Sequence, residues 1–249
     1  MYTITRVSQN CDPVTSNMHI KDLPSILFLL LAIQTAKACN PARRDANDPN
    51  PFTIGTDGPA PEATKGFALN HIGLLTTNLS SMKNFYGNIL GMRNIFDAQV
   101  TAEYSVTYMG YAQGGRNGTG FQTGAEMAVA KNNMYGLLEL VQFNVSDDRL
   151  IASTERTNTF GHVGLIVPDV LEAEKYLEAQ GVAVLKRVGE AVEDFTGPIP
   201  NSMGIGEFAG LHLAAKRALV KAQGLIGFEM FLMVTDPDGN VVEIQQQDL

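Results

Sequence analysis

The stretch Phe-Gly-His-Val-Gly-Leu-Ile-Val-Pro-Asp, residues 160–169, places one imidazole, that of His162, at the start of an apolar run. A glycine precedes the histidine, and a Pro-Asp pair ends the run in the way that a strand gives way to a capped helix. An earlier stretch, Ala-Leu-Asn-His-Ile-Gly-Leu-Leu at residues 68–75, repeats the pattern around His71. Both stretches predict a short strand that carries a histidine near its beginning.

Each histidine is followed later in the chain by a glutamate among aliphatic residues, Glu139 in Leu-Leu-Glu-Leu-Val and Glu243 in Val-Val-Glu-Ile. A buried carboxylate without a partner is costly, so each glutamate in such a strand needs one. A single strand histidine or glutamate is more often structural, but two of each at equivalent positions favour a common site. Two imidazoles and two carboxylates suit one divalent metal of the Zn, Ni, Co, Fe or Mn type.

The chain contains an internal repeat, which is found by counting residues onward from each of the two histidines. The residues seven positions later are Asn78 and Asp169, both suited to cap a helix. We expect a first module with a helix that ends at Gly91 and a second whose helix ends at Gly181. The sequence therefore predicts an α+β fold of two tandem β-α-β-β-β modules.

The remaining elements are predicted from local patterns. In the second module, residues 189–224 depart from the repeat and form an insertion with a helix in its second half. The expected strands after the first helix are residues 105–112, 125–130 and 135–143, and those after the second are residues 182–188, 226–234 and 240–247.

Composition limits the classes of partner. The formal net charge of -8 argues against nucleic acid and anionic membrane surfaces, which require clustered Lys and Arg. The chain has two cysteines, Cys11 and Cys39, so a cysteine-rich zinc site is excluded. A small-molecule substrate is the expected ligand.

The N-terminal part predicts a targeting segment followed by a linker. Residues 26–33 are an apolar run, and Ala-Lys-Ala ending at Ala38 resembles a signal peptidase site. We expect residues 1–38 to be a signal peptide or leader that directs the chain to secretion or the endoplasmic reticulum, with no membrane association after cleavage. A cytoplasmic protein with an apolar tail is the alternative. Both Met1 and Met18 fit this pattern as the first residue of the translated chain.

Residues 39–66 are rich in Pro, Asn, Asp and Gly and predict a disordered linker. The folded domain is expected at residues 67–249, with modules at 67–147 and 158–249.

Three longer motifs carry a family resemblance. They are Asn-Phe-Tyr-Gly-Asn-Ile-Leu-Gly-Met at 84–92, Gly-His-Val-Gly-Leu-Ile-Val-Pro-Asp-Val at 161–170 and Asp-Pro-Asp-Gly-Asn-Val-Val-Glu-Ile at 236–244. Together they resemble the vicinal oxygen chelate superfamily, and most closely its glyoxalase I (lactoylglutathione lyase) branch. The resemblance spans residues 67–249 and implies cupped mixed sheets around a metal, with the two modules pairing within one chain or across a homodimer.

The resemblance also implies an activity. It is a metal-dependent lyase or isomerase that rearranges a hemithioacetal or a related α-hydroxycarbonyl compound through a metal-bound enediolate, as in methylglyoxal detoxification. The implied cofactor is one divalent ion, Zn or Ni, held by His71, Glu139, His162 and Glu243. Glu243 is the implied base, and Glu139 takes the matching role on the other side. A metal-dependent oxygenase and a non-catalytic resistance-type binding protein on the same fold are the alternatives.

The substrate-binding residues implied by the resemblance differ from the glyoxalase pattern. Relatives that use glutathione hold its carboxylates with basic residues at positions that are Leu75 and Asn158 here. Arg156 lies close to the second of these positions, and Lys186 matches a third family contact. These two residues are the candidates for binding an anionic substrate, of which a glutathione adduct is one.

Overall fold

The first module forms a four-stranded mixed sheet in the order β1-β4-β3-β2. The central strand β4 is parallel to β1 and antiparallel to β3, which in turn is antiparallel to β2. The strands are β1 (His71–Thr76), β2 (Arg93–Gln99), β3 (Tyr104–Gly110) and β4 (Leu137–Phe143).

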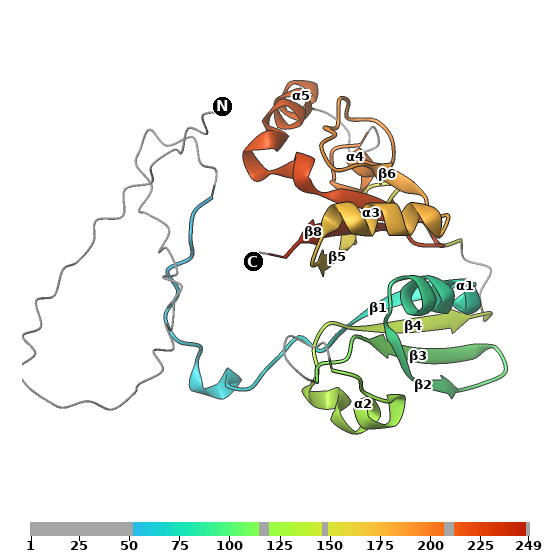
Figure 1. The fold of residues 1–249 in the computed structure, drawn as a ribbon. Coiled ribbons are helices and arrows are strands. Elements are labelled where there is room, and N and C mark those ends of the chain that lie inside the picture. The colour runs from blue at the N-terminus through green and yellow to red at the C-terminus, as the bar shows by residue number, and fades with distance from the viewer. Residues whose placement is uncertain (1–51, 115–119, 146–148, 207–211, 248–249) are drawn as a thin grey trace, which may run out of the picture. The chain divides into compact units, whose positions relative to one another are not determined.

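The second module repeats this topology in the order β5-β8-β7-β6. Strand β8 is parallel to β5 and antiparallel to β7, so β8 takes the place of β4. The predicted α+β fold of two tandem modules is confirmed (Figure 1). The strands are β5 (His162–Val167), β6 (Val184–Lys186), β7 (Leu232–Thr235) and β8 (Val241–Gln246).

This computed structural model describes residues 52–114, 120–145, 149–206 and 212–247, which all belong to one structural unit, residues 44–249. The predicted leader lies outside these ranges and stays a prediction. Of the predicted linker, residues 52–66 are described; they are exposed and hold one 3-10 turn, Glu62–Thr64. None of the helices in the described ranges has both the length and the apolar composition needed to span a membrane.

The helix that follows the first strand of each module is capped as the sequence predicts. The Asn78 side chain accepts a hydrogen bond from the Ser81 amide, and Asp169 accepts from two amides of its helix. Gly91 and Gly181 follow these helices with φ of +82° and +74°, conformations that glycine adopts without strain. The two helices are α1 (Leu79–Lys83), which continues as a π-helical segment at Asn84–Ile89, and α3 (Val170–Ala179).

In the first module one strand assignment is wrong and one strand was not predicted. The predicted strand at 125–130 is a helix, α2 (Gly124–Ala130), because Thr123 and Glu126 form a reciprocal capping box and the alanines favour helix. The third strand of the sheet is instead β2, whose apolar alternation is broken by a bulge between Asn94 and Phe96.

The second module has one similar difference. The first part of the predicted strand at 226–234 belongs to two 3-10 turns that meet at Gly227, and the strand begins at Leu232. The predicted helix of the insertion is present from Leu213, and its expected apolar positions Phe208 and Leu211 lie outside the described residues. The other helical segments are α4 (Pro198–Ser202), α5 (Leu213–Ala222) and the 3-10 turns Lys131–Asn133, Gln223–Ile226 and Phe228–Met230.

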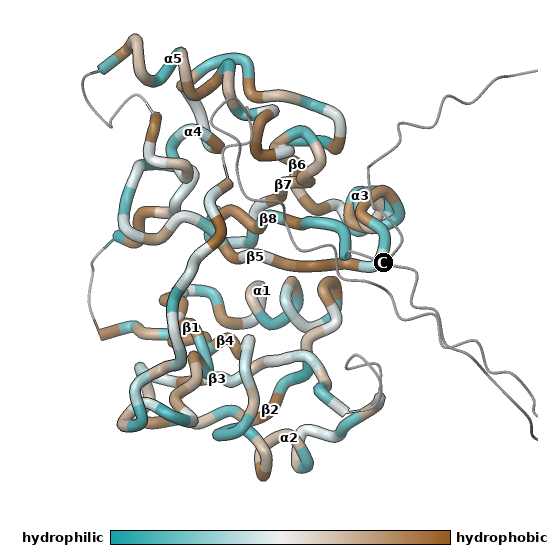
Figure 2. The backbone as a smooth tube through the Cα atoms, turned by 90° about the vertical axis from the view of Figure 1, so that its left-hand side faces the viewer, coloured by the Kyte–Doolittle hydropathy of each residue, from teal (hydrophilic) through white to brown (hydrophobic). Residues whose placement is uncertain are grey.

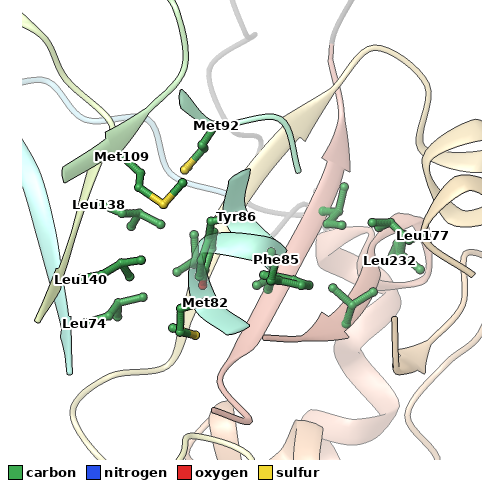
Figure 3. Packing of buried hydrophobic residues seen from close by; sticks show 14 of the residues in the cluster. Leu74, Met82, Phe85, Tyr86, Met92, Met109, Leu138, Leu140, Leu177 and Leu232 are labelled. Atoms are coloured by element: carbon green, nitrogen blue, oxygen red, sulfur yellow. The ribbon is translucent and has the colours of Figure 1, made fainter. Parts of the chain in front are cut away.

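One apolar cluster joins the two modules. Phe85 and the helix that carries it lie between side chains of the first sheet, such as Leu140, and side chains of the second module, such as Leu232 (Figure 3). Strand β5 is almost entirely hydrophobic along its length (Figure 2). The buried members of the cluster are Leu74, Met82, Phe85, Tyr86, Met92, Met109, Leu138, Leu140, Val163, Val170, Leu177, Leu232, Val234, Val242 and Ile244.

Two tyrosine hydroxyls also connect the modules. The buried Tyr86 hydroxyl donates to the Asp236 carboxylate over 3.1 Å, and burial followed by this carboxylate raises the pKa of Tyr86 well above its usual value. Asp236 in turn accepts from the backbone amides of Asp238 and Asn240 in the turn before β8. The second hydroxyl, of Tyr176, donates to the carbonyl of Ile89 at the surface.

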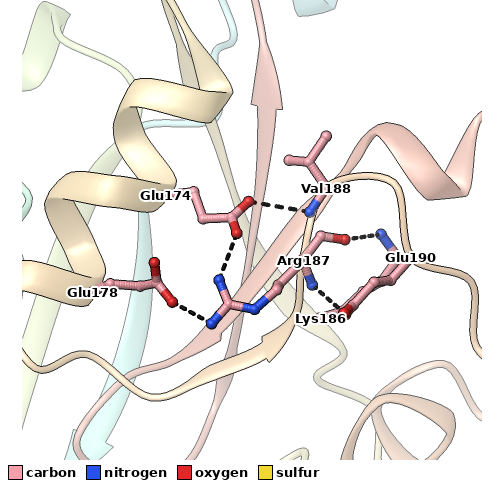
Figure 4. A network of polar contacts seen from close by, with 6 residues as sticks. All are labelled: Glu174, Glu178, Lys186, Arg187, Val188 and Glu190. Carbon is pink, nitrogen blue, oxygen red and sulfur yellow. Dashed lines mark hydrogen bonds and ion pairs between the residues drawn. The ribbon is translucent and has the colours of Figure 1, made fainter.

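An arginine fixes α3 to the strand that follows it. The Arg187 guanidinium donates to Glu174 over 2.7 Å and to Glu178, both on α3 (Figure 4). The Glu174 carboxylate also accepts from the Val188 amide. Because one planar guanidinium binds two carboxylates, α3 is held in register with the end of β6.

Replacing Tyr86 by Phe removes a buried donor to Asp236 without changing the shape of the core. We expect the free energy of unfolding to fall by about 1–3 kcal/mol, because a buried carboxylate loses a partner. Urea denaturation measures the change. Tyr176→Phe is the matched control, since this residue is 46% exposed and its loss should cost less than about 0.5 kcal/mol. Equal effects of the two variants would contradict a role for the buried bond.

Candidate functional site

The first module brings His71 and Glu139 together. In the parallel ladder of β1 and β4, Glu139 pairs with Gly73, two residues beyond His71, so both side chains project from one face of the sheet. His71 Nε2 lies 3.3 Å from Glu139 Oε2. Gly73 lies beside the carboxylate, where a methyl group would make an ordinary contact of 3.7 Å with Oε2.

The second module builds the same pair in the same register. Glu243 pairs with Gly164 in the ladder of β5 and β8, and His162 Nε2 lies 3.8 Å from Glu243 Oε2. The other carboxylate oxygen, Oε1, accepts a hydrogen bond of 2.6 Å from the Gln245 amide. Each sheet therefore presents one imidazole and one carboxylate, and only Oε2 of Glu243 faces the histidine.

Tyr108 lies beside the first pair, and the sequence patterns did not identify it as a site residue. It is the direct cross-strand partner of Glu139, and its hydroxyl lies 3.3 Å from His71 Nε2. The ring stacks on Phe96. Burial, and then the Glu139 carboxylate, raise the pKa of Tyr108 above its usual value, so the hydroxyl stays protonated and can donate. Knowledge of the register between β3 and β4 would have identified it; the second module has Met233 at this position.

Asn70 is a second residue that the sequence did not single out. Its side-chain amide donates to the carbonyls of Lys131 and Met134, over 2.8 and 2.7 Å. Its side-chain oxygen lies 2.9 Å from His71 Nδ1. Asn70 therefore connects the histidine to the turn that precedes β4.

One chain does not bring the four predicted ligands together. Leu74 and Leu138 alternate with His71 and Glu139 along their strands and point into the shared apolar cluster, so the first pair faces away from that cluster. The same alternation of Val163 and Val242 turns the second pair away. In the described ranges, no three His, Cys, Asp or Glu side chains lie close enough to hold a metal ion. The sequence predicts one four-ligand site, whereas the chain has two half-sites, His71–Glu139 and His162–Glu243.

The donors of the first half-site nevertheless fit a metal ion. Ligands about 2.0–2.2 Å from one zinc, at the angles of a tetrahedral or octahedral site, lie about 3–3.5 Å apart. The 3.3 Å between His71 Nε2 and Glu139 Oε2 agrees with this spacing. When both atoms present lone pairs, a proton or a cation is needed between them. Each half-site supplies two such ligands and leaves the others to be provided from elsewhere.

Lys186 is already bound to the backbone. Its amine is buried and donates to the carbonyls of Arg187, Glu229 and Phe231, over 3.1, 3.4 and 2.6 Å. Burial is the main cause that lowers the pKa of this lysine. All three donors are used, so Lys186 stabilises the start of β7 in this conformation and offers no free donor to a substrate.

The other candidate substrate contacts are more open. Arg156 is exposed, and its guanidinium makes no ion pair with the part of the chain that is described. Leu75 is exposed on the same face of β1 as His71. Asn158 is occupied locally, since its side chain binds the carbonyl of Arg156 and the amide of Phe160. Of these positions, Arg156 alone offers a positive charge without a partner in the described chain.

The insertion covers the sheet face that carries Glu243. Val241 and Met233 lie on this face, because Val241 is two residues from Glu243 and Met233 is its cross-strand partner. Both pack in a cluster with Ile199 of α4 and Phe228. Part of the insertion is therefore core, and α4 packs on the same face of the sheet as Glu243.

A cavity of about 590 Å³ lies between the modules, and Asn70 and His71 are among the residues that line it. Leu138, Leu165 and other aliphatic side chains line most of it. Its tyrosine hydroxyls donate to other groups, Tyr111 to the carbonyl of Leu90 and the remaining two as described above. The cavity suits mainly apolar contents, with the His71 imidazole in its wall.

The chain matches a known family model. The model is that of the Glyoxalase/Bleomycin resistance protein/Dioxygenase superfamily, and it matches residues 68–196, which is more than half of the chain. The chain belongs to this superfamily. The predicted resemblance is thereby confirmed at the level of the superfamily, which contains lyases, dioxygenases and resistance proteins.

The chain is similar to several solved structures at low identity. Trypanothione-dependent glyoxalase I of Leishmania major is 16% identical, with a TM-score of 0.40 over 72% of this chain and 86% of that one. Zea mays glyoxalase I is 16% identical with a TM-score of 0.43, over 73% of this chain and 45% of that one. This chain therefore spans less than half of the maize enzyme.

A glyoxalase/dioxygenase from Nostoc punctiforme is 13% identical, with a TM-score of 0.40 over 79% of this chain and the whole of that one. A search of curated proteins found no significant match.

Replacing Lys186 by Met keeps the apolar stem and removes the donor to three carbonyls. We expect the free energy of unfolding to fall by about 1–3 kcal/mol, because buried carbonyls lose their partner. Arg156→Met is the matched control and should stay within about 0.5 kcal/mol of the wild type. Urea denaturation compares them. A Lys186→Met protein of unchanged stability would contradict the structural role and return this lysine to the candidates for substrate binding.

Proposed function

We propose that this protein is a metal-dependent lyase or isomerase of the glyoxalase I type. Its reaction would move a proton between adjacent carbons of a hemithioacetal or a related α-hydroxycarbonyl compound. The observation that carries the proposal is the pair of imidazole and carboxylate that the two modules build in the same register, His71 with Glu139 and His162 with Glu243. A structural origin for one such pair is plausible, but the same pair at the same step of two ladders favours a shared function.

We further propose that the complete site forms between two copies of the chain. The half-sites face away from the cluster that joins the modules, so a four-ligand site requires the first half-site of one copy and the second half-site of another. Strands β1 and β5 support this arrangement, because each lies at the edge of its sheet and pairs with a strand on one side only, among the described residues. Their large exposed apolar side chains, Ile72, Leu75 and Ile166, suit burial against a partner.

A bound divalent ion, Zn or Ni, would supply Lewis-acid polarisation of the substrate oxygens and so make the neighbouring carbon acidic. The protein's own contribution is the proton transfer. Glu243 Oε1 is held by Gln245, which leaves Oε2 as the oxygen that takes the proton from one carbon and returns it to the next. No other reactant is consumed, so the reaction is an isomerisation. The α4 segment packs on this face of the sheet, and the Glu243 side chain is 12% exposed.

Glu139 is less suited to be the base. Tyr108 is its direct cross-strand partner and His71 Nε2 lies 3.3 Å from its Oε2, so two side chains crowd the side where a substrate would approach. Glu139 therefore serves mainly as a ligand. The presence of this second carboxylate also distinguishes the site from the two-His, one-carboxylate arrangement of non-haem iron oxygenases.

The substrate class follows from the charges around the site. Leu75 and Asn158 replace the basic residues that bind glutathione carboxylates in relatives, and Lys186 is occupied by the backbone. Arg156 is the remaining candidate for an anion. A substrate with at most one carboxylate fits this set better than glutathione. Assays should therefore compare the hemithioacetals of glutathione with those of small uncharged thiols.

Glu243→Gln tests the assignment of the base. The amide keeps an oxygen for the metal but cannot accept the proton, so we expect near-normal metal content and a loss of turnover of about 10²–10⁴-fold. Metal analysis of the purified protein and a hemithioacetal assay give the two readouts. Glu139→Gln is the matched variant and should lose metal affinity more than turnover per bound metal. If Glu139→Gln alone abolished turnover, the roles of the two glutamates would be reversed.

Mixing two inactive variants tests where the site forms. The first variant carries His71→Ala and Glu139→Gln, and the second carries His162→Ala and Glu243→Gln. If sites form between copies, a mixed dimer has one intact site, and random exchange should restore about a quarter of the wild-type activity, because half of the dimers are mixed and each has one of two sites. If each site lies within one chain, mixing restores nothing. Each double variant, taken through the same exchange procedure alone, is the control.

A further inference from the structure

The orientation of the Asn70 amide is fixed by its surroundings. Its nitrogen lies 2.8 Å from the Lys131 carbonyl and 2.7 Å from the Met134 carbonyl, and both of these groups can only accept. The opposite assignment would place three oxygens against one another. The side-chain oxygen of Asn70 must therefore be the atom that lies 2.9 Å from His71 Nδ1.

A carbonyl oxygen accepts and does not donate, so His71 Nδ1 has to carry the proton of this bond. We infer that Asn70 is a positioning residue that fixes His71 in the tautomer with its proton on Nδ1. Whenever the ring is neutral, Nε2 then presents its lone pair. This nitrogen is the one that lies 3.3 Å from the Tyr108 hydroxyl and 3.3 Å from Glu139 Oε2.

The backbone makes Asn70 well placed for this role. It directly precedes β1, and its carbonyl accepts from the Leu137 amide at the start of β4. Its side chain satisfies the carbonyls at both ends of the turn that leads to β4. Asn70 therefore ties the histidine to the strand that carries Glu139, and fixes the position of the imidazole ring as well as its tautomer.

The second half-site lacks an equivalent residue. Gly161 precedes His162, and Nδ1 of His162 has no hydrogen-bond partner among the residues that the structure describes. The two half-sites therefore differ in how their histidine rings are held before a metal binds. The first holds its nitrogen ligand in the form that binds a cation, whereas His162 is free to exchange tautomers. This asymmetry provides an internal control in the same molecule.

The consequence for metal binding rests on the proposed function. A ligand nitrogen must be unprotonated, and a partner on the other ring nitrogen sets which one that is. Removal of such a partner typically weakens metal binding by about 10–100-fold. Asn70 should therefore make the first half-site the one that loads a metal first. The tautomer itself does not depend on any metal or activity.

The experiment is NMR of the metal-free full-length chain labelled with ¹⁵N-histidine, at a pH where the ring of His71 is neutral. His71→Gln identifies its signals. We expect His71 to carry its proton on Nδ1, whereas His162 should show a mixture. In Asn70→Ala, His71 should shift towards the form protonated on Nε2 while His162 is unchanged.

A wild-type His71 protonated on Nε2 would overturn the inference, and this measurement needs no variant to fold. An Asn70→Ala protein with lowered stability but an unchanged tautomer would also overturn it, because Asn70 would then be structural only. Titration with Zn²⁺ against a chromophoric chelator separates the two proposals. Asn70→Ala should bind about 10–100-fold more weakly than the wild type. If the wild type binds no Zn²⁺ but the tautomer is as expected, the proposed function fails and the inference stands.

Discussion

Burial of one face of each sheet in a shared apolar cluster determines where everything else in this protein can lie. Leu74, Leu138, Val163 and Val242 point into that cluster, and because strand side chains alternate, the neighbouring histidines and glutamates must point out of it. The buried bond between Tyr86 and Asp236 holds the two modules in this arrangement. Packing of the inner sheet faces therefore places the histidines and glutamates on the two outer faces.

Much of the fold could be predicted because its determinants are local. The helix caps at Asn78 and Asp169, and the glycines that follow the helices, form hydrogen bonds or adopt dihedral angles that depend on residues within one turn. The pairing of each histidine with a glutamate followed from the repeat. The strand β2 and the helix α2 were missed because a bulge hides the alternation of β2 and the short apolar pattern of α2 fits either structure.

The parts of the site that could not be predicted depend on register and on packing between modules. A repeat indicates which positions are equivalent, but the contact between Tyr108 and Glu139 depends on the offset of two strands. The interaction of Asn70 with His71 depends on a turn sixty or so residues away in the chain. The separation into two half-sites depends on which sheet faces pack together, and equivalent positions alone do not specify this.

The parallel ladder between the first and last strand of each module also limits the order in which the chain can fold. His71 pairs with Leu137 and His162 pairs with Val241, so each ladder closes only when nearly the whole module has been made. Such distant pairing is slow compared with helix formation. During synthesis, β1 stays unpaired until β4 has left the ribosome. Strand β5 stays unpaired until the entire insertion and then β8 have been made. A growing chain therefore exposes its apolar strands longest in the second module, where premature association is the greatest hazard.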